Sequence, residues 1–574
     1  MYDILIKNGK IVDGSGGAPY VADVAVKDGK IVKIGEIRED AEKVIDAAGR
    51  IVTPGFIDMH SHADLTVCLY PDAENLLGQG VTTVFTGHCG MGMAPVGEYW
   101  TGMFEDTKAM QLVIPHDLAS WFPGAYPCLD SPTMRRAFKE RFGVEMDWTS
   151  FGDYREKLKS TGVGVNMNML VGHSQVRISA LGPDFKRPAT QAEIDHMKAD
   201  IAEAMEHGAC GMSFGLDYDA SNYAEDDEMY QLAEVVKSYG GIVAAHCQMR
   251  NERRGVKMEQ HMLYGARELM ELGLKVGVPV HISHICGGYN GCFGDQHMFD
   301  AGAERLLQLI DEYRAKGVRV TWDVLTIPVR AFYYFPQLAS VLIYYISAAG
   351  GNKAFSEKLR SPGFRFYIAE KLKNKERIVF PRWNDSVEVT ECKNSAYIGK
   401  SIRTLAEERG VSSEEMMVQI LHEDIETCAS YPLAPGLMET RVYENRPEAS
   451  IGLDNCAFNY DYEGALPDMP ADRSTPVSYC GMIKFLESQR DKPIEQTIRK
   501  LSGNAADNMR LRDRGYIREN MAADILVIDC ENLRSNENLI DPRQRPDGFD
   551  YVIVNGRIAV DHGTHTHVRS GELL

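Results

Sequence analysis

Apolar and polar residues alternate along roughly the first 50 residues of the chain, and the same alternation returns at its far end. The first run contains "KNGK" from Lys7 and "KDGK" from Lys27, and Asn-Gly and Asp-Gly pairs favour the positive φ angles of tight hairpin turns. "ADILVID" and "YVIVNGRIAVDHG" repeat this style near the other end. We therefore expect both terminal segments to meet in one small β-sandwich domain, formed by residues 1–54 and 505–574.

Residues 55–504 follow a different pattern, in which apolar β-type runs are separated by amphipathic helical stretches such as "AEIDHMKADIAEAMEHG". This alternation predicts parallel strands joined by crossover helices. Eight candidate strands suggest an α/β fold with a closed (β/α)8 TIM barrel, whose active site would lie at the carboxyl ends of the strands. The candidates in chain order are "GFIDMH", "VTTVFTG", "VGVNMNMLVG", "CGMSFG", "GIVAAH", "VPVHISH", "VRVTWDV" and "ASIGLD".

Two connections between the expected strands are unusually long, one near residues 93–162 and one near residues 325–448. Long excursions on that face of a barrel commonly form lids, so we expect lid-like insertions. Residues 330–345, "RAFYYFPQLASVLIYY", are rich in aromatic side chains. These suit the lining of a pocket for a bulky apolar substrate, and equally a packed lid or a subunit interface.

Composition and charge narrow the partners of the protein. A formal net charge of −20 argues against nucleic acid, which needs a basic face. No uninterrupted apolar run approaches the length of about 18 residues that would cross a membrane. The opening "MYDILIKNGK" lacks a signal core, so we expect a cytoplasmic protein with its 12 cysteines as thiols or ligands. A small molecule is the expected partner, and the acidic surface is compatible with any oligomeric state, a homo-oligomer included.

Six of the eight expected strands end in side chains that bind metals. Imidazole, thiolate and carboxylate groups are ligands of zinc, and the carboxyl ends of barrel strands converge. One buried histidine alone is more often a hydrogen-bonded core residue, so the agreement of six strand ends carries the prediction of a metal site. In strand order the residues are His60 and His62, His88 and Cys89, His173, His246, His281 and His284, and Asp454.

His60 and His62 occupy alternate positions of a strand-like segment, so both imidazoles lie on one face. Such a pair can share one ion, which removes the cost of burying two unsatisfied rings. His88 lies one residue before Cys89, and His281 lies three residues before His284. Because side chains alternate along a strand, these odd spacings direct His88 and His281 away from the face that carries Cys89 and His284. We therefore expect His88 and His281 to be packing or surface residues.

Longer segments carry a more specific signal and keep one order along nearly the whole chain. They are "TPGFIDMHSHADL", "GVTTVFTGHCGMGMAPV", "VGHSQVR", "SFGLDY", "HCQMRNE", "ISHICG", "IGLDN" and "RGYIRENMAADILVID". With these segments the chain resembles the D-aminoacylase, or N-acyl-D-amino-acid deacylase, branch of the metal-dependent amidohydrolase superfamily. The resemblance implies a barrel joined to a small β-sandwich from both termini. It also implies a zinc-dependent hydrolase of non-peptide C–N bonds.

The resemblance further implies a set of metal ligands. Cys89, His246 and His284 would hold one tightly bound zinc ion. His60 and His62 would lie at a second, weaker metal position that Cys89 bridges. In the hydantoinase branch a carboxylated lysine ends strand four, where this chain has "SFGLDY" and no lysine. The thiolate would fill the role of that lysine.

Asp454 matches the catalytic aspartate of the family and is also expected at the metal. Zinc lowers the pKa of a bound water and polarises the scissile carbonyl. Asp454 would take the proton of that water and return it to the leaving nitrogen. His173 has no ligand role in the resemblance. We expect it to support the reaction from beside the site, with a purely structural role as the alternative.

The chain departs from the family in the segments that recognise the substrate. In the family, cationic and phenolic groups hold the free carboxylate of the N-acyl amino acid. Tyr218 of "GLDY" is retained, but Cys286 stands in place of a lysine and Val329 in place of a tyrosine. The family's His-Pro-Arg segment is also missing, with Arg473 as the candidate replacement for its arginine. Because a buried carboxylate needs a charge partner, we expect a substrate other than a simple N-acyl-D-amino acid.

Three interpretations of the expected metal site are compatible with the sequence. The leading one is hydrolysis of the amide bond of an N-acyl compound. The first alternative is opening of a cyclic amide or imide, or deamination of a heterocycle, on the same site. The second is a catalytically inactive barrel that binds a ligand, against which the presence of the expected ligands and of Asp454 counts. The sequence leaves open the acyl group, the amine, the stereochemistry and whether one or two metals bind.

Overall fold

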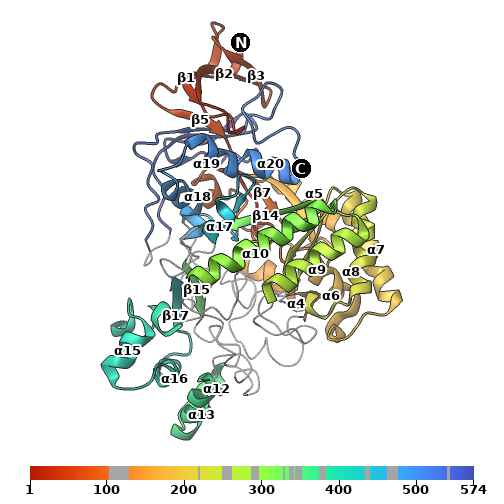
Figure 1. Ribbon diagram of the computed structural model, residues 1–574, viewed down its shortest axis with the longest axis vertical. Helices are drawn as coiled ribbons and strands as arrows, with labels where there is room; N and C mark the ends of the chain where they lie inside the picture. Colours follow the sequence, from red (N-terminus) through yellow and green to blue (C-terminus); the bar gives the residue numbers. More distant parts are fainter. Residues whose placement is uncertain are drawn as a thin grey trace.

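Two sheets organise the chain, a barrel of parallel strands and a mixed sheet built from both ends of the sequence (Figure 1). The computed structural model describes residues 1–101, 128–216, 220–247, 261–285, 296–326, 330–334, 342, 345, 349, 352–373, 383–432, 440–461, 476–538 and 543–574.

Eight parallel strands form the barrel sheet, in the spatial order β18, β14, β13, β12, β11, β10, β7, β6. Its two edges approach each other, because the Met59 amide donates to the Ile451 carbonyl at 3.0 Å. The barrel is therefore nearly closed, and each strand lies within or overlaps one of the eight candidates expected from the sequence. The strands are β6 (Phe56–Asp58), β7 (Val81–Thr86), β10 (Asn166–Gly172), β11 (Gly211–Gly215), β12 (Ile242–His246), β13 (Val280–Ile282), β14 (Val320–Leu325) and β18 (Ser450–Gly452).

Helices connect and cover the barrel strands. In α7 the apolar residues Ile194, Met197 and Ile201 are buried at spacings of three and four, and Thr190 and Glu193 close a capping box at its start. Packing of such amphipathic faces on the strands builds the main core. The helices are α1 (Glu74–Leu77), α5 (Phe151–Thr161), α6 (His173–Leu181), α7 (Gln191–Glu206), α8 (Asp226–Ser238), α9 (His261–Val276), α10 (Gln296–Ala315), α17 (Thr440–Glu444), α18 (Val477–Ser488), α19 (Ile494–Leu501) and α20 (Gly503–Met509).

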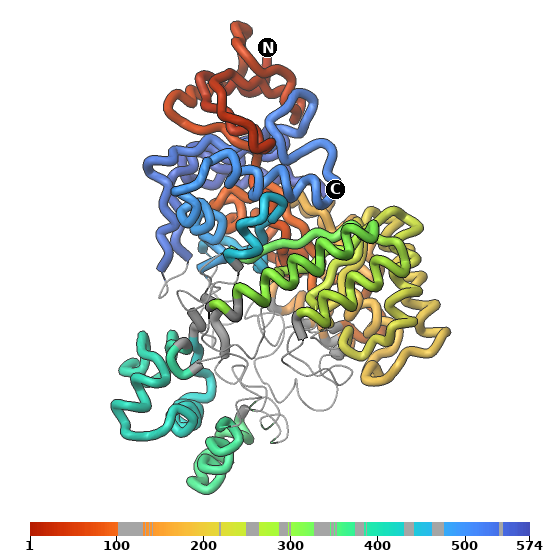
Figure 2. The backbone as a smooth tube through the Cα atoms, viewed as in Figure 1, coloured from red at the N-terminus to blue at the C-terminus, as the bar shows by residue number. Residues whose placement is uncertain are grey.

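The mixed sheet confirms that both ends of the chain meet in one β-unit. Figure 2 shows the first segment of the chain, in red, beside the last, in blue. β5 pairs antiparallel with β19 and so joins the two halves. The boundaries 1–54, 55–504 and 505–574 stay predictions. The nine strands are β1 (Tyr2–Ile11), β2 (Tyr20–Lys27), β3 (Lys30–Gly35), β4 (Ala41–Asp46), β5 (Ile51–Pro54), β19 (Ile525–Ile528), β20 (Phe549–Val554), β21 (Arg557–Asp561) and β22 (Thr564–His565).

One of the two expected turns near the start of the chain is wrong. Asp28 and Gly29 have positive φ angles of 49° and 76° and form the two-residue turn between β2 and β3. Asn8 also has a positive φ of 60°, but it lies inside β1, where the register with β2 shifts. The Asn-Gly pair makes a bulge there, because β1 continues its pairing with β2 on both sides of it.

The two insertions contain further secondary structure. In the first, β8 (Tyr99–Thr101) pairs with β9 (Cys128–Asp130), which α4 (Ser131–Phe142) follows. The second has its own hydrophobic core, separate from that of the barrel. Whether the insertions act as lids stays a prediction, and most of residues 330–345 lie outside the described residues. The second insertion contains β15 (Arg330–Tyr334), β16 (Glu388–Glu391), β17 (Cys428–Pro432), α12 (Asn352–Leu359), α13 (Pro362–Leu372), α14 (Trp383–Ser386), α15 (Ile402–Arg409) and α16 (Ser413–Glu423).

Across the described part of the chain, no helix combines the length and the apolar character that a crossing of the bilayer requires.

Candidate metal centre

Three of the expected site residues have a left-handed backbone at the point where the chain leaves a barrel strand. Their φ angles are 57° for Cys89, 34° for His284 and 54° for Asp454. A non-glycine residue pays about 1–2 kcal/mol for this conformation, which therefore persists only where the surroundings impose it. In each case the turn lies just beyond the carboxyl end of a strand, where it sets the direction of the side chain.

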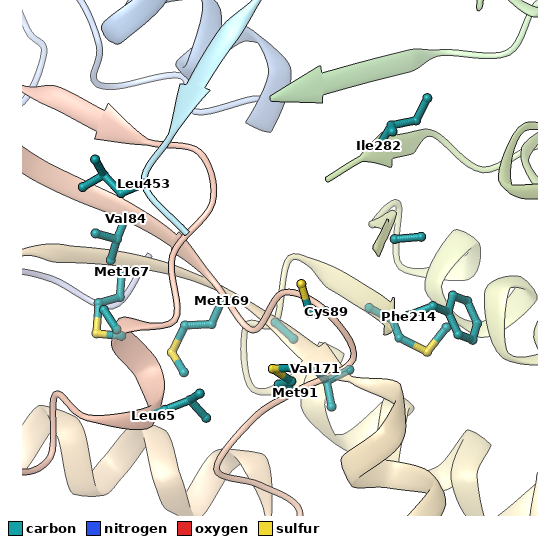
Figure 3. Packing of buried hydrophobic residues seen from close by; sticks show 14 of the residues in the cluster. Leu65, Val84, Cys89, Met91, Met167, Met169, Val171, Phe214, Ile282 and Leu453 are labelled. Atoms are coloured by element: carbon teal, nitrogen blue, oxygen red, sulfur yellow. The ribbon is translucent and has the colours of Figure 1, made fainter. Parts of the chain in front are cut away.

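Cys89 lies at the centre of the cluster. Its Sγ is 3.4 Å from His60 Nε2, 3.5 Å from His284 Nε2 and 3.8 Å from His246 Nδ1. All four residues are buried. With Zn–S near 2.3 Å and Zn–N near 2.05 Å, the edge of a tetrahedral site joining S to N is about 3.6 Å. The sulfur-to-nitrogen distances therefore suit a shared ion. Figure 3 shows Cys89 beside Met91 and Val171, on a wall of buried apolar side chains.

Asp454 completes the cluster on its other side. One carboxylate oxygen, Oδ1, is 3.3 Å from His60 Nε2 and 3.1 Å from His62 Nε2. Its side chain is 31% exposed, whereas those of His60 and His62 are at most 4% exposed. The aspartate is thus the accessible member of the cluster, in a position to meet a substrate or a water molecule.

The ligand atoms form overlapping groups in which neighbouring atoms lie within 4.8 Å. One group holds Cys89 with His246 and His284, and another holds Cys89 with His60 and His62. A third group holds Asp454 with His60 and His284. The six residues predicted as ligands are therefore brought together, and Cys89 belongs to the first two groups. Their roles as ligands stay a prediction.

Two buried aspartates that the sequence interpretation missed support the histidines. Asp323 Oδ1 accepts hydrogen bonds from His281 Nε2 and from the His284 amide, both at 2.9 Å, and lies 3.5 Å from His60 Nδ1. Asp58 Oδ1 accepts from the His60 amide at 3.1 Å. A carboxylate in the middle of an apolar strand, as in "VTWDV", is the signal that could have identified Asp323, because a buried charge requires partners.

His88 and His281 are both fully buried, so the packing interpretation holds for them and the surface one does not. His88 Nδ1 is 3.0 Å from Ser283 Oγ, and its ring centroid lies 4.0 Å from that of His60. His281 reaches Asp323, as described above, and so belongs to the support behind the cluster.

The electrostatics of the cluster favour a cation. Burial raises the pKa of the Cys89 thiol, but the His60 and His284 imidazoles outweigh it and hold that pKa well below its ordinary value. Burial likewise raises the pKa of Asp454, which His60 and His62 bring well below its ordinary range. In return, Asp454 and Cys89 overcome the effect of burial on His62 and raise its pKa to about 9. The low pKa values of the Cys89 thiol and the Asp454 carboxyl thus favour a positive charge between them, carried by protonated imidazoles or by a metal ion.

This donor set fits a zinc ion. The pKa of the thiol is held low, which favours the thiolate, and the Nε2 atoms of His60 and His284 lie 3.4 Å and 3.5 Å from the sulfur, close to the tetrahedral edge. Asp454 adds a carboxylate on the other side of His60. A divalent cation would supply the positive charge that protons on the imidazoles supply otherwise.

His173 lies apart from these groups. It is fully buried at the start of α6, with Nδ1 at 2.8 Å from Ser221 Oγ and Nε2 at 2.9 Å from Glu228 Oε1. The next residue, Ser174, donates its amide to the Gly90 carbonyl at 2.9 Å, directly after Cys89. His173 thus lies in the wall behind the thiolate.

The two substrate-binding residues expected from the sequence, Tyr218 and Arg473, lie outside the described residues. The same is true of Cys286 and Val329.

Comparison with known proteins gives independent information on the chain. The model of the amidohydrolase family matches residues 43–241. The chain is 30% identical to the N-acyl-D-glutamate deacylase of Alcaligenes xylosoxydans xylosoxydans over 579 residues, covering 100% of this chain and 96% of that protein. It is 32% identical to the D-aminoacylase of the same organism over 284 residues, which are 49% of this chain and 50% of that protein. The latter match thus spans half of the relative.

Solved structures have the same fold. A crystal structure of D-aminoacylase superposes with a TM-score of 0.71 at 24% identity, covering 100% of both chains. The structure of N-acyl-D-glutamate deacylase from Bordetella bronchiseptica, complexed with zinc and a phosphonate inhibitor, superposes with a TM-score of 0.68 at 23% identity. It covers 100% of this chain and 99% of that one. These matches agree with a barrel joined to a sheet from both termini.

Proposed function

The chain belongs to the amidohydrolase family, in its N-acyl-D-amino-acid deacylase branch, and from this premise we propose that it hydrolyses the exocyclic amide bond of an N-acyl compound. The observation that carries the proposal is the position of Cys89. Its thiolate faces His60, His246 and His284 at 3.4–3.8 Å, at the carboxyl ends of the barrel strands, with the Asp454 carboxylate beside it.

In this proposal Cys89, His246 and His284 hold one zinc ion tightly. His60, His62 and Asp454 border a second, weaker position that shares Cys89. When bound, zinc lowers the pKa of a water molecule and polarises the carbonyl of the scissile amide. Asp323 and Asp58 hold the histidine-bearing segments in place through the hydrogen bonds described above, so the donor atoms need little rearrangement.

Asp454 serves as general base and then as general acid. Its carboxylate accepts a proton from the attacking water, whose oxygen bonds to the amide carbon. The same proton then passes to the leaving nitrogen as the C–N bond breaks, so that the products are a carboxylic acid and an amine. The partial exposure of Asp454 in an otherwise buried cluster supports this role, because the base must reach water and substrate.

We assign His173 a positioning role. Both its ring nitrogens lie within hydrogen-bonding distance of Ser221 and Glu228, and the segment that it begins contacts the turn after Cys89. His173 therefore holds the wall against which the thiolate rests, and its proton stays in the network behind the site.

For the substrate, we propose an N-acyl compound other than a simple N-acyl-D-amino acid. Cys286 and Val329 remove a cationic and a phenolic partner for a substrate carboxylate. Without such partners the charge would be costly to bury. Two relatives are named D-aminoacylase and N-acyl-D-glutamate deacylase. Anionic N-acyl-D-amino acids are therefore the substrates against which uncharged N-acyl compounds should be compared.

Cyclic amides and imides are the alternative substrates. β11 runs to Gly215 and is followed by Leu216, and residues 217–219 contain no lysine that could be carboxylated. The Cys89 thiolate would take the place of such a lysine at the two metal positions, which favours an exocyclic amide.

The test is a turnover assay of the zinc-loaded protein with three substrate classes: N-acyl-D-amino acids, uncharged N-acyl amides and cyclic imides. We expect hydrolysis of uncharged N-acyl amides, and a loss of about 10²–10⁴-fold in kcat for Asp454→Asn, because the amide cannot accept the proton. Turnover of cyclic imides alone would replace the proposal by the alternative. Preferential turnover of N-acyl-D-amino acids would show that other residues, Arg473 first, bind the carboxylate.

A further inference from the structure

A surface pocket lies at the end of the barrel opposite the candidate metal centre. It has a volume of about 580 Å³, within the range of about 300–1,000 Å³ typical of small-molecule sites. Arg319, which lines it, directly precedes β14, and Arg510, which also lines it, reaches the carbonyl of Gly240 just before β12. Since the metal-binding side chains follow the carboxyl ends of the strands, a strand length of about 15–20 Å separates the two sites.

Four arginines and one aspartate supply the charges of this pocket, which we call the arginine pocket. On a chain with a net charge of −20, this is a local concentration of positive charge. Leu511 and Met521 add apolar surface between the guanidinium groups. The charged residues are Arg319, Arg510, Arg512, Arg518 and Asp507.

The aspartate is already engaged by other groups. Asp507 Oδ1 accepts a hydrogen bond from Tyr516 at 2.7 Å, and its Oδ2 lies 3.4 Å from the guanidinium of Arg499, which does not line the pocket. Asp507 also acts on Arg319, so the pocket holds four positive charges against one negative charge.

Within the described part of the chain, the four guanidinium groups have no carboxylate partner. Arg319 donates to the backbone carbonyl of Asp507 at 2.6 Å, Arg510 donates to that of Gly240 at 3.2 Å, and Arg518 stacks 4.1 Å above the ring of Tyr516. Among the residues that the structure describes, none of the four is within 4.0 Å of a carboxylate oxygen. Burial, and the neighbouring Arg510, lower the pKa of Arg319, whereas Asp507 raises it, so Arg319 and Arg510 repel each other.

From this geometry we propose that the arginine pocket binds a small polyanion, one that carries two or more phosphate or carboxylate groups. Guanidinium groups present planar pairs of donors that match both kinds of group bidentately. All four arginines line this pocket and are exposed, which suits a ligand with several negative charges. The apolar residues Leu511 and Met521 suit a short organic body, and the volume limits the ligand to about the size of a nucleotide.

Isothermal titration calorimetry at low ionic strength tests the proposal, with pyrophosphate and citrate as probes of the two ligand chemistries. We expect the zinc-loaded wild type to bind at least one of them, and the tighter probe identifies whether phosphate or carboxylate is preferred. Arg512→Gln should weaken binding by about tenfold, because one charge-assisted hydrogen bond is lost. Arg512 is exposed, so the variant should fold normally.

Arg403→Gln is the matched control. It removes an exposed arginine from α15, which lies far from α20 in Figure 1. It should change the dissociation constant less than about twofold. Both probes also chelate zinc, so a binding signal could come from the metal centre. Comparison of the wild type with Arg512→Gln separates binding at the arginine pocket from binding at the metal. Binding that is equal in the wild type and Arg512→Gln lies elsewhere, the metal centre included, and overturns the proposal, as does the absence of binding of both probes.

Discussion

Glu228 joins His173 and Arg177 in a buried polar network behind the candidate metal centre, and its removal gives a quantitative test of the structure. Its Oε1 is 2.9 Å from His173 Nε2, and its Oε2 accepts a hydrogen bond from Arg177. All three side chains are at most 2% exposed. Burial raises the pKa of Glu228, but His173 and Arg177 outweigh it and hold the pKa below its ordinary value.

Glu228→Gln leaves the Arg177 guanidinium buried without its compensating charge. Breaking such a pair from one side costs about 3–5 kcal/mol. An unfolding entropy of about 2.1 cal/mol/K per residue amounts to about 1.2 kcal/mol/K for this chain. If the chain unfolds as one unit, the melting temperature falls by about 2–4 °C.

The linkage of this network to pH has a defined sign. The pKa of Glu228 is lower in the folded than in the unfolded state, so its ionised form stabilises the fold at pH values above the unfolded pKa. This contribution is lost as the pH falls through the folded pKa. The difference in stability between wild type and Glu228→Gln should therefore be full at neutral pH and shrink in acid.

Calorimetry of the wild type, Glu228→Gln, Arg177→Met and the double variant measures the effect. Because the double variant leaves neither charge alone in the core, it should lose about 1–3 kcal/mol less than the two single losses combined. The reasoning is refuted if Glu228→Gln melts within about 1 °C of the wild type at neutral pH, or if the single losses simply add.

Two further substitutions test how the ligands are held. Asp323→Asn keeps the shape of the side chain but removes its charge beside the histidines. The zinc affinity, measured by competition with a chelator, should therefore fall about 10–100-fold. An unchanged affinity would contradict the role of Asp323 in supporting the histidines. Gly87→Ala places a Cβ 2.1 Å from the Leu170 carbonyl oxygen at a φ of 75°, two residues before Cys89. The substitution should lower the free energy of unfolding by more than about 2 kcal/mol and reduce the metal content. The control Gly49→Ala, at a φ of 77° with open space around its Cβ, should lower the free energy of unfolding by about 1 kcal/mol and leave the metal content unchanged. Equal losses of stability in the two variants would be inconsistent with this account.

The barrel could be predicted because two signals in the sequence are local. Each parallel strand is a short apolar run between turn residues, and each functional side chain follows the end of its run. The pairing of His60 with His62 needs only the two-residue period of a strand. That these ends meet follows from closure of the barrel, which predicts a metal site among nine candidate residues. The choice of six ligands among them comes from the resemblance to the deacylase family.

The supporting residues could not be predicted in the same way, because their roles depend on contacts between distant segments. Asp323 reaches His284 and His281 from a neighbouring strand, and Glu228 meets His173 from α8. The bulge at Asn8 has a similar cause. An Asn-Gly pair favours a positive φ, but whether the chain turns back or stays in the strand is decided by the partner strand.

The metal content of the purified protein tests the central claim most directly. Zinc is measured by mass spectrometry after dialysis against a weak chelator, for the wild type, Cys89→Ala and the control Cys68→Ala, which removes another buried thiol. We predict that the wild type and Cys68→Ala retain about one zinc ion per chain and that Cys89→Ala loses it together with activity. Equal zinc retention by Cys89→Ala and the wild type would contradict a centre built on this thiolate.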